Sequence, residues 1–427
     1  LQMGLIIEEL KDRHQTEFTL ADLEEIYPAA SGRSKATLPD SNELTEDAKA
    51  FKARALKATA DLQSGDPECT KVWKRIMELS KEDLKKNYDA LDVHFELWKG
   101  ESDVQKYIAD MLQSFIDKGI AYNSQGALVV DVNEEGDSKE LPPCIVRKSD
   151  GSSLYATTDL ATLVERELLY KPDAYVYVAD KRQSLHYTSF FRVARKAGIV
   201  RPEESLSFLG FGTMNGKDGK PFKTRDGGVM RLEYLLKEID DEMLNKIKEN
   251  QKEKENLNID EAEAKHTAKT VALAAVKYGD LSNQASKDYV FDIDRFTSFE
   301  GNTGPYILYT IVRIKSILSK YEAKGGDISA LKDAIMPAVN AGQKNLMLSL
   351  AKFNATIESA YDESAPHKIC AYIYELANAF NGFYHDTKIL SEENEELKKS
   401  YISLLVLTKQ ILEACIDMLG FSAPDRM

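Results

Sequence analysis

The stretch from Cys144 to Gly212 constrains the fold most, because apolar strand-like segments alternate in it with helical patterns. Cys144–Arg147, Ala174–Ala179 and Leu206–Gly212 have the composition of strands, and Ala174–Ala179 has few polar atoms, as a buried parallel strand does. The order strand, helix, strand, helix, strand predicts an α/β fold with a parallel, doubly wound sheet. Ligands of such sheets bind at the carboxyl ends of the strands, so a site is expected there.

The rest of the chain is more helical. At 427 residues it is too long for one ordinary core, so two or three domains are expected. A hairpin is predicted over Ala121–Val132, and the alternation in Leu91–Phe95 predicts a strand. After Arg231 the apolar residues recur with helical spacing, which predicts a separate helical bundle over Glu300–Met427.

Composition excludes several classes of protein. Hydrophobic residues make up 43% and charged residues 30%, as in a soluble globular protein, and no run of about 18 apolar residues predicts a membrane span. The four cysteines lie far apart and show no zinc-ligand spacing, so no structural metal is expected and a reducing compartment fits best. The net charge of −14 argues against indiscriminate nucleic-acid binding but permits a local basic surface that binds RNA.

The segment Gly216–Gly228, GKDGKPFKTRDGG, is a glycine-rich loop with four cations. Pro221 forbids a helix interior there, so the loop is expected at the surface. Lysines on a surface loop suit a triphosphate whose charge moves during reaction. Taken alone, the loop is more typical of a solvated basic turn, because loops of lysine and glycine are common.

Several segments together resemble one family. The Lys220-x-x-Lys223-Thr224 spacing resembles the KMSKS signature of class I aminoacyl-tRNA synthetases, although Pro221 and Phe222 replace its Met and Ser. The order of DGSSLYATTDL, Gln183 with Leu185-His186, GKPFKTR, KDYVFDIDRF and EGNTGPYILYTIVRI is similar to that of arginyl-tRNA synthetases, as is the ending PDRM. No HIGH-like tetrapeptide occurs in the sequence, which begins at Leu1. We therefore expect an N-terminally truncated fragment that lacks the HIGH-type ATP loop and is inactive alone.

The resemblance assigns arginine binding to Tyr155, Asp159 and Gln183. Tyr155 and Asp159 are four apart and would share a helix face, and Gln183 follows a strand end. A guanidinium needs acceptors placed to match its planar donors, which a carboxylate, an amide oxygen and a phenol oxygen supply. Each residue also has a structural interpretation, as core, helix cap and surface residue respectively.

For ATP, the resemblance implies Lys220 and Lys223 as the catalytic residues that contact the phosphates, with Mg²⁺ accompanying ATP. Further ATP contacts are expected from His186 and from the Gly212, Thr213 and Met214 segment, whose backbone would pair with adenine. A lone histidine such as His186 is more often structural.

For RNA, Tyr306, Tyr309 and Arg313 share a helix face, and aromatic rings with a nearby cation suit unstacked bases. The resemblance places them, with Arg426 and Met427, against the anticodon loop of tRNA(Arg). The alternative is that one or both tyrosines pack in the bundle core.

The resemblance therefore implies an arginyl-tRNA synthetase, which ligates L-arginine to tRNA(Arg) with ATP through an arginyl-adenylate. The expected domains are a class I Rossmann-type catalytic domain, incomplete at its N-terminus (1–230, with an insertion at roughly 35–130), a helical connecting segment (231–299) and a helical anticodon-binding bundle (300–427). A cytoplasmic monomer is expected. The rival interpretations are another class I synthetase, such as the zinc-containing cysteine enzyme, and an inactive tRNA-binding fragment or paralogue.

Overall fold

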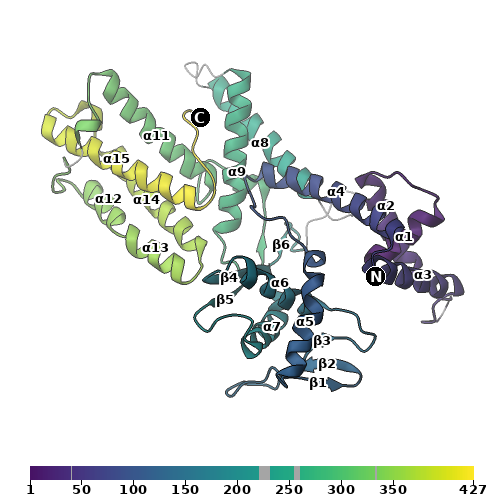
Figure 1. Ribbon diagram of the computed structural model, residues 1–427. Helices are drawn as coiled ribbons and strands as arrows, with labels where there is room; N and C mark the ends of the chain where they lie inside the picture. Colours follow the sequence, from purple (N-terminus) through teal and green to yellow (C-terminus); the bar gives the residue numbers. More distant parts are fainter. Residues whose placement is uncertain (40, 221–230, 254–259, 332–333) are drawn as a thin grey trace. The chain divides into compact units, whose positions relative to one another are not determined.

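The computed structural model describes residues 1–39, 41–220, 231–253, 260–331 and 334–427 (Figure 1). Its contacts divide it into two compact units, Leu1–His94 and Phe95–Met427. The division falls inside the range 35–130 that the sequence predicts as an insertion. The predicted domain boundaries stay predictions.

The first unit is helical. Its helices are α1 (Gln2–Asp12), α2 (Leu20–Arg33), α3 (Glu46–Gln63) and α4 (Pro67–Ala90). The strand predicted at Leu91–Phe95 is wrong, because these residues form a turn and an unpaired segment after α4. Asp92 has a φ of 50°, in the left-handed region that strands do not use. Val93 N–H donates to the Tyr88 carbonyl at 2.9 Å, so these residues form the C-terminal turn of α4.

Helix α1 is the centre of this unit, and its residues from Gly4 to Leu10 are buried. Gly4 lies where α1 meets α3, and a β-carbon on it would come within 1.9 Å of the Ala55 carbonyl oxygen. Only glycine therefore permits this approach of the two helix backbones.

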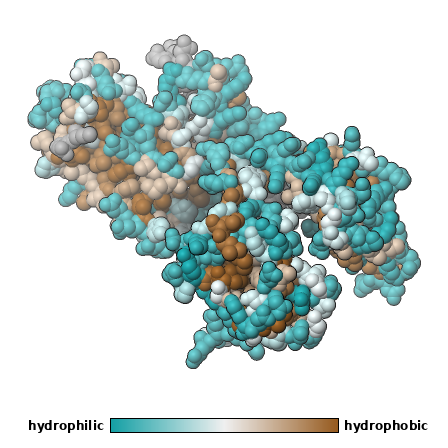
Figure 2. Space-filling view, viewed as in Figure 1, coloured by the Kyte–Doolittle hydropathy of each residue, from teal (hydrophilic) through white to brown (hydrophobic). Residues whose placement is uncertain are grey.

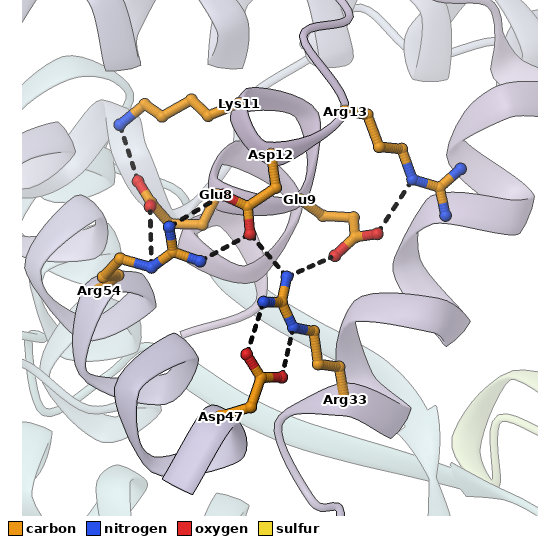
Figure 3. A network of polar contacts seen from close by, with 8 residues as sticks. All are labelled: Glu8, Glu9, Lys11, Asp12, Arg13, Arg33, Asp47 and Arg54. Atoms are coloured by element: carbon orange, nitrogen blue, oxygen red, sulfur yellow. Dashed lines mark hydrogen bonds and ion pairs between the residues drawn. The ribbon is translucent and has the colours of Figure 1, made fainter.

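A network of charged side chains extends across α1, α2 and α3 (Figure 3). Asp12 accepts hydrogen bonds from Arg33 at 2.6 Å and from both ends of the Arg54 guanidinium at 2.8 and 2.6 Å. Arg33 also binds Asp47 through two bonds of 2.8 Å. Asp12 and Arg33 thus join all three helices, and the charge-assisted bonds from Arg54 and Arg33 lower the pKa of Asp12 from 3.8 to about 2.

We predict that Asp12→Asn lowers the free energy of unfolding of this unit by about 1–2 kcal/mol at pH 7, after allowance for solvent screening. The folded pKa is depressed, so the stabilisation is complete above the unfolded pKa and is lost as pH falls through the folded value. The difference between wild type and variant should therefore shrink between about pH 4 and pH 2. Urea unfolding across this range measures it.

The control is Asp61→Asn, which removes only an exposed pair with Lys57 on the same helix and should cost less than about 0.5 kcal/mol. Equal stabilities of wild type and Asp12→Asn at pH 7 would contradict a stabilising role for the network.

The second unit begins with α/β structure. Its elements are η1 (Glu101–Val104), α5 (Gln105–Asp117), β1 (Ala121–Ser124), β2 (Ala127–Val130), β3 (Cys144–Arg147), α6 (Tyr155–Leu169), β4 (Ala174–Asp180), η2 (Lys181–Gln183), α7 (Ser184–Ala197) and β5 (Ser205–Phe211). The predicted hairpin over 121–132 is confirmed as β1 and β2. Strands β4 and β5 pair in parallel in register Ala174↔Ser205, as expected for strands on either side of a crossover helix.

One detail of the predicted sheet is wrong. Strand β3 pairs antiparallel with β2 in a three-stranded sheet, rather than extending the parallel sheet of β4 and β5. The preceding hairpin offers β3 a nearby partner, which a pattern of alternating elements does not reveal. Helix α6 still connects the two sheets, because buried Leu160 and Leu163 belong to the same hydrophobic cluster as Val146 and Tyr175.

Strand β4 has two different faces. Tyr177 packs against Tyr187, Phe190 and Phe191 of α7, with ring centroids 5.3–5.5 Å apart. On the opposite face Val176 and Val178 are 57% and 66% exposed. The space-filling view shows apolar surface over this α/β part (Figure 2).

The remainder of the second unit is mainly helical. Its elements are β6 (Met214–Asn215), α8 (Leu232–Glu253), α9 (Glu261–Leu281), β7 (Tyr289–Val290), α10 (Ile293–Phe296), α11 (Gly304–Ala323), η3 (Ser329–Leu331), α12 (Ala341–Ala351), α13 (Phe353–Asp362), α14 (Pro366–Asp386), η4 (Ile389–Ser391) and α15 (Glu395–Met418). The prediction of a helical connecting segment over 231–299 missed β7, whose two residues pair in parallel with β6. Two residues are too few for a strand pattern to show in the sequence.

A single hydrophobic core joins these helices. It runs from Leu235 in α8 through Val271 in α9 to Ile311, Phe380 and Leu405 in the bundle helices. Tyr278 is fully buried, and its hydroxyl donates to the Cys370 carbonyl at 2.9 Å, which ties α9 to α14. In the described part of the chain, none of the helices has the length and apolar character needed to cross a bilayer.

Candidate functional site

Helix α6 brings Tyr155 and Asp159 to one face, as the spacing predicts. The helix begins at Tyr155, and Thr157 fixes its start by accepting from Leu154 N–H at 3.0 Å and donating to the Val146 carbonyl of β3 at 2.7 Å. Tyr155 is 71% exposed, so it is not a core residue. Asp159, one turn further on, is half-buried.

His186 meets Asp159 directly. Its Nε2 lies 2.6 Å from Asp159 Oδ2, and because an ionised carboxylate only accepts, the imidazole N–H donates. The ring contacts Tyr187 and Phe190 of α7 with centroids 5.3 Å apart, which fixes its direction. Two residues that the sequence assigned to different substrates are therefore hydrogen-bonded to each other.

Gln183 lies at the carboxyl end of β4, where the sequence placed it. It ends the short helix η2 and precedes α7, with its side chain exposed. Asp180 caps η2 by accepting from the Arg182 backbone N–H at 2.8 Å. This end of β4 and the start of α7 thus carry Gln183 and His186, and the His186 bond joins them to Asp159 on α6.

Glu101 is a neighbour that sequence reasoning missed. It begins η1, which packs against α6. Burial and the nearby Asp159 carboxylate raise the pKa of Glu101 above its usual value. The negative charge of Asp159 therefore acts on Glu101, and the two carboxylates make this region electronegative. Glu101 and Asp159 are 58 positions apart, so only the fold brings them together.

The Gly212–Met214 segment is held by a loop that follows α9. Gly212 N–H donates to the Ala285 carbonyl at 2.8 Å, and Thr213 N–H donates to Asp288 Oδ1 at 2.8 Å. The Thr213 carbonyl accepts from Tyr289 N–H at 3.1 Å. In a parallel pair, alternate residues turn their backbone groups to opposite sides, so the groups of Met214 point away from β7. The backbone groups of Met214 are therefore not used by the pairing of β6 with β7.

The cationic loop is only partly described. Lys220 is exposed at the end of a turn in which Gly216 N–H donates to the Lys220 carbonyl at 2.7 Å. Lys223 lies outside the described residues, so its predicted role stays a prediction. Lys217 is engaged elsewhere, with its ammonium 3.1 Å from Asp292 and 2.7 Å from Asp294.

In the bundle, Tyr306, Tyr309 and Arg313 lie on α11, and the structure brings Tyr306 and Arg313 against α14. Tyr306 O–H donates to Asn378 at 2.6 Å, and Arg313 donates to Asn381 at 2.6 Å. The Arg313 guanidinium lies 4.7 Å from the centre of the Tyr309 ring. Both tyrosines are half-buried, which lies between the two alternatives of the sequence analysis, contact with RNA and packing in the bundle core.

The two C-terminal residues lie in the tail that follows α15. Arg426 forms two bonds with Glu263 of α9, at 2.9 and 2.6 Å, and Met427 packs partly buried against the helical core. The tail before them is fixed by Lys277, which donates to the Gly420 carbonyl at 2.5 Å. Among the described residues, the structure shows no bond from Arg426 to the face of α11 and α14 that carries Tyr306, Tyr309 and Arg313.

The described residues contain no group of three or more histidine, cysteine or acidic side chains arranged to hold a metal ion. All four cysteines are buried and unpaired.

Residues 1–293 match the family described as tRNA synthetases class I (R), catalytic domain, and residues 307–427 match the DALR anticodon binding domain. Over its full length the chain is 72% identical to the arginine–tRNA ligase of Agathobacter rectalis and 49% identical to that of Alkaliphilus oremlandii. It spans 72% of the length of each.

Two solved structures agree with this fold. The arginyl-tRNA synthetase of Plasmodium falciparum superposes with a TM-score of 0.77 at 24% identity, covering 100% of this chain and 68% of that one. The Thermus thermophilus arginyl-tRNA synthetase superposes with a TM-score of 0.76 at 19% identity, covering 99% and 74%. The predicted fold class, a class I catalytic domain followed by an all-helical anticodon-binding domain, is confirmed.

We predict that a side chain at Gly212 destabilises the segment that follows β5. A β-carbon there would lie 2.3 Å from the Lys287 carbonyl oxygen, so Gly212→Ala forces the two backbones apart and strains the bond to Ala285. We expect the free energy of unfolding to fall by about 1–3 kcal/mol, as for other overpacked sites. Thermal unfolding of the chain measures it.

The matched control is Gly382→Ala in α14, where nothing lies within 4 Å of the added carbon. Alanine favours helix there, so that variant should be neutral or stabilised by up to about 1 kcal/mol. A Gly212→Ala chain as stable as the control would show that the segment can move without cost.

Proposed function

The chain belongs to the class I arginyl-tRNA synthetase family, and on that premise we propose that its residues bind L-arginine, ATP and tRNA(Arg) for ATP-dependent aminoacylation through an arginyl-adenylate. The sequence contains no HIGH-like tetrapeptide, and its curated relatives are longer than the chain. We propose that the HIGH-type ATP loop lies in the part of the relatives that this chain does not match. The activity therefore belongs to a protein in which these residues occur together with that loop.

The bond between His186 and Asp159 is the observation that carries the proposal for arginine. It shows that the carboxylate of Asp159 is half-buried, oriented and able to hold a planar N–H donor at 2.6 Å. A guanidinium N–H has the same planar geometry and would approach the same carboxylate. Exposed Tyr155 and Gln183 are proposed to supply the remaining acceptors, and Glu101 adds negative charge.

The proposed chemistry requires little covalent help from the protein. A carboxylate oxygen of arginine attacks the α-phosphorus of ATP in line, the bond to the β-phosphate oxygen breaks, and pyrophosphate leaves with its electron pair. No general base is needed, because the nucleophile is already ionised at neutral pH. Lys220 and Lys223 are proposed to neutralise the charge that develops on the leaving group. Mg²⁺ would enter with ATP, held by its phosphate oxygens.

Transfer to RNA completes the proposed reaction. The arginyl group passes from the adenylate to a hydroxyl of the terminal ribose of tRNA(Arg), and AMP is released. The α11–α14 face, with Tyr306, Tyr309 and Arg313, is proposed to bind the anticodon loop, and Arg426 and Met427 to contact the same RNA. We propose a monomer that acts in the cytoplasm.

We predict that Asp159→Asn, in a protein that also has the HIGH-type loop, raises the KM for arginine by about ten- to a hundredfold. The substitution keeps the size of the side chain and removes one charge-assisted bond, which contributes roughly 1.5–3 kcal/mol. The KM for ATP should change by less than about threefold. ATP–pyrophosphate exchange in the presence of tRNA(Arg) measures both constants.

Asp110→Asn, on the exposed side of α5, is the control and should leave both constants unchanged. Unaltered arginine kinetics in Asp159→Asn would remove this residue from the substrate site. Absence of any exchange in the wild-type protein would instead favour the inactive tRNA-binding alternative.

A second prediction compares the effects of two lysines of the cationic loop on turnover. Lys223→Ala should lower the turnover number by about 10²–10³-fold, because contacts to developing charge strengthen in the transition state, and substrate KM values should move far less. Lys217 provides the control, since its ammonium binds Asp292 and Asp294, and Lys217→Ala should change turnover by less than about twofold. Single-turnover adenylate formation compares the two, and equal rate constants would refute the phosphate role of Lys223.

A further inference from the structure

One face of α14 carries a set of polar and aromatic residues that the sequence analysis did not single out. They recur every three or four positions and so share a side of the helix: Tyr374, Asn378, Asn381 and Tyr384. This side meets α11 at the residues proposed to bind RNA. Asn381 is half-buried between the two helices, whereas Tyr384 is 42% exposed.

Asn381 binds two of the three α11 residues that are proposed to contact RNA. Its Oδ1 accepts from Arg313 at 2.6 Å, and its Nδ2 donates to the Tyr306 hydroxyl at 2.9 Å. A guanidinium has no acceptor, so the oxygen end of the amide must face Arg313 and the nitrogen end must face Tyr306. The Tyr306 hydroxyl, which accepts from Asn381, then donates to Asn378. Because Arg313 can only donate, it determines the direction of these three hydrogen bonds.

The bond from Asn381 also places the guanidinium between two rings. Arg313 lies 4.7 Å from the centre of the Tyr309 ring and 5.6 Å from the centre of the Tyr384 ring. Tyr306 makes an edge contact with Tyr374 at 5.7 Å. Aromatic rings, a guanidinium and the exposed amide of Asn378 at one surface are groups of the kind that stack on unpaired bases and bind their edges.

We propose that Asn381 is a positioning residue for this RNA-binding face, and that Tyr384 is a further ring against which an unpaired base stacks. Asn381 holds the Tyr306 hydroxyl and the Arg313 guanidinium in place before RNA arrives, so that binding does not have to order them. The ligand is the unpaired loop of an RNA hairpin. The inference rests on the proposed function, because it assumes that the α11–α14 face binds the anticodon loop.

The test uses the 427-residue chain and a labelled hairpin RNA of the tRNA(Arg) anticodon arm, with fluorescence anisotropy at one salt concentration. A hairpin with the same stem and a UUCG loop reports binding that does not depend on the loop. Asn381→Leu, which keeps the approximate size but neither hydrogen bond, should weaken binding of the anticodon hairpin by about five- to thirtyfold. It should leave binding of the UUCG hairpin unchanged. Tyr384→Leu should weaken the anticodon hairpin by about five- to a hundredfold.

Asn354→Leu on exposed α13 is the matched control and should change neither affinity. A double-mutant cycle separates positioning from general packing. In a chain that already carries Tyr306→Phe and Arg313→Met, Asn381→Leu should have no further effect on RNA binding, because Asn381 then has nothing to position. If the leucine variant loses cooperative thermal unfolding, Asn381→Ala takes its place throughout.

The outcomes distinguish this inference from the proposed function. A wild-type chain that binds both hairpins equally would overturn the RNA-binding face and the role of Asn381 together. A wild-type chain that prefers the anticodon hairpin, with Asn381→Leu unchanged or equally harmful in the Tyr306→Phe, Arg313→Met background, would overturn only the role of Asn381. Unchanged binding by Tyr384→Leu would overturn the stacking role of that ring.

Discussion

The contact between the end of β5 and the loop after α9 is the constraint on which the second unit depends. Gly212 donates to Ala285 and leaves no room for a β-carbon beside Lys287, while Thr213 binds Asp288 through its backbone. Lys181, directly after β4, reaches the same Asp288 at 2.8 Å. The carboxyl ends of β4 and β5 are thus fixed to a segment that leads into the helical part, and they are followed by Gln183 and by Gly212–Met214, which are proposed to bind arginine and ATP respectively.

Local patterns predicted much of this arrangement. The four-residue spacing of Tyr155 and Asp159 placed them correctly on one helix face, because helical geometry is determined by neighbours along the chain. Gln183 after β4 and the shared face of Tyr306, Tyr309 and Arg313 were predictable for the same reason. The hydrogen-bond partners of these side chains could not be predicted from the spacing.

Interactions between distant elements escaped prediction. Glu101 beside Asp159 and Asn381 beside Arg313 depend on how helices pack, which no local spacing encodes. The predicted partner of β3 was wrong because an antiparallel hairpin competed for this strand.

Asp92 shows a local failure, since the alternation around it suggested a strand while its left-handed backbone does not permit one. For His186 the sequence left an ATP contact and a structural role open, and neither expectation named its partner, the Asp159 carboxylate.

The continuous core of the helical part has a consequence for cooperativity. Helices α8 and α9 share one hydrophobic cluster with α11, α14 and α15, and Tyr278 of α9 is hydrogen-bonded to the backbone of α14. Packing of this kind makes helices open together, with one free energy, rather than one at a time. Amide hydrogens in α9 are therefore expected to exchange with solvent at rates set by the stability of the whole bundle. A ligand held on α11 and α14 would slow exchange in α9, a helix it need not touch.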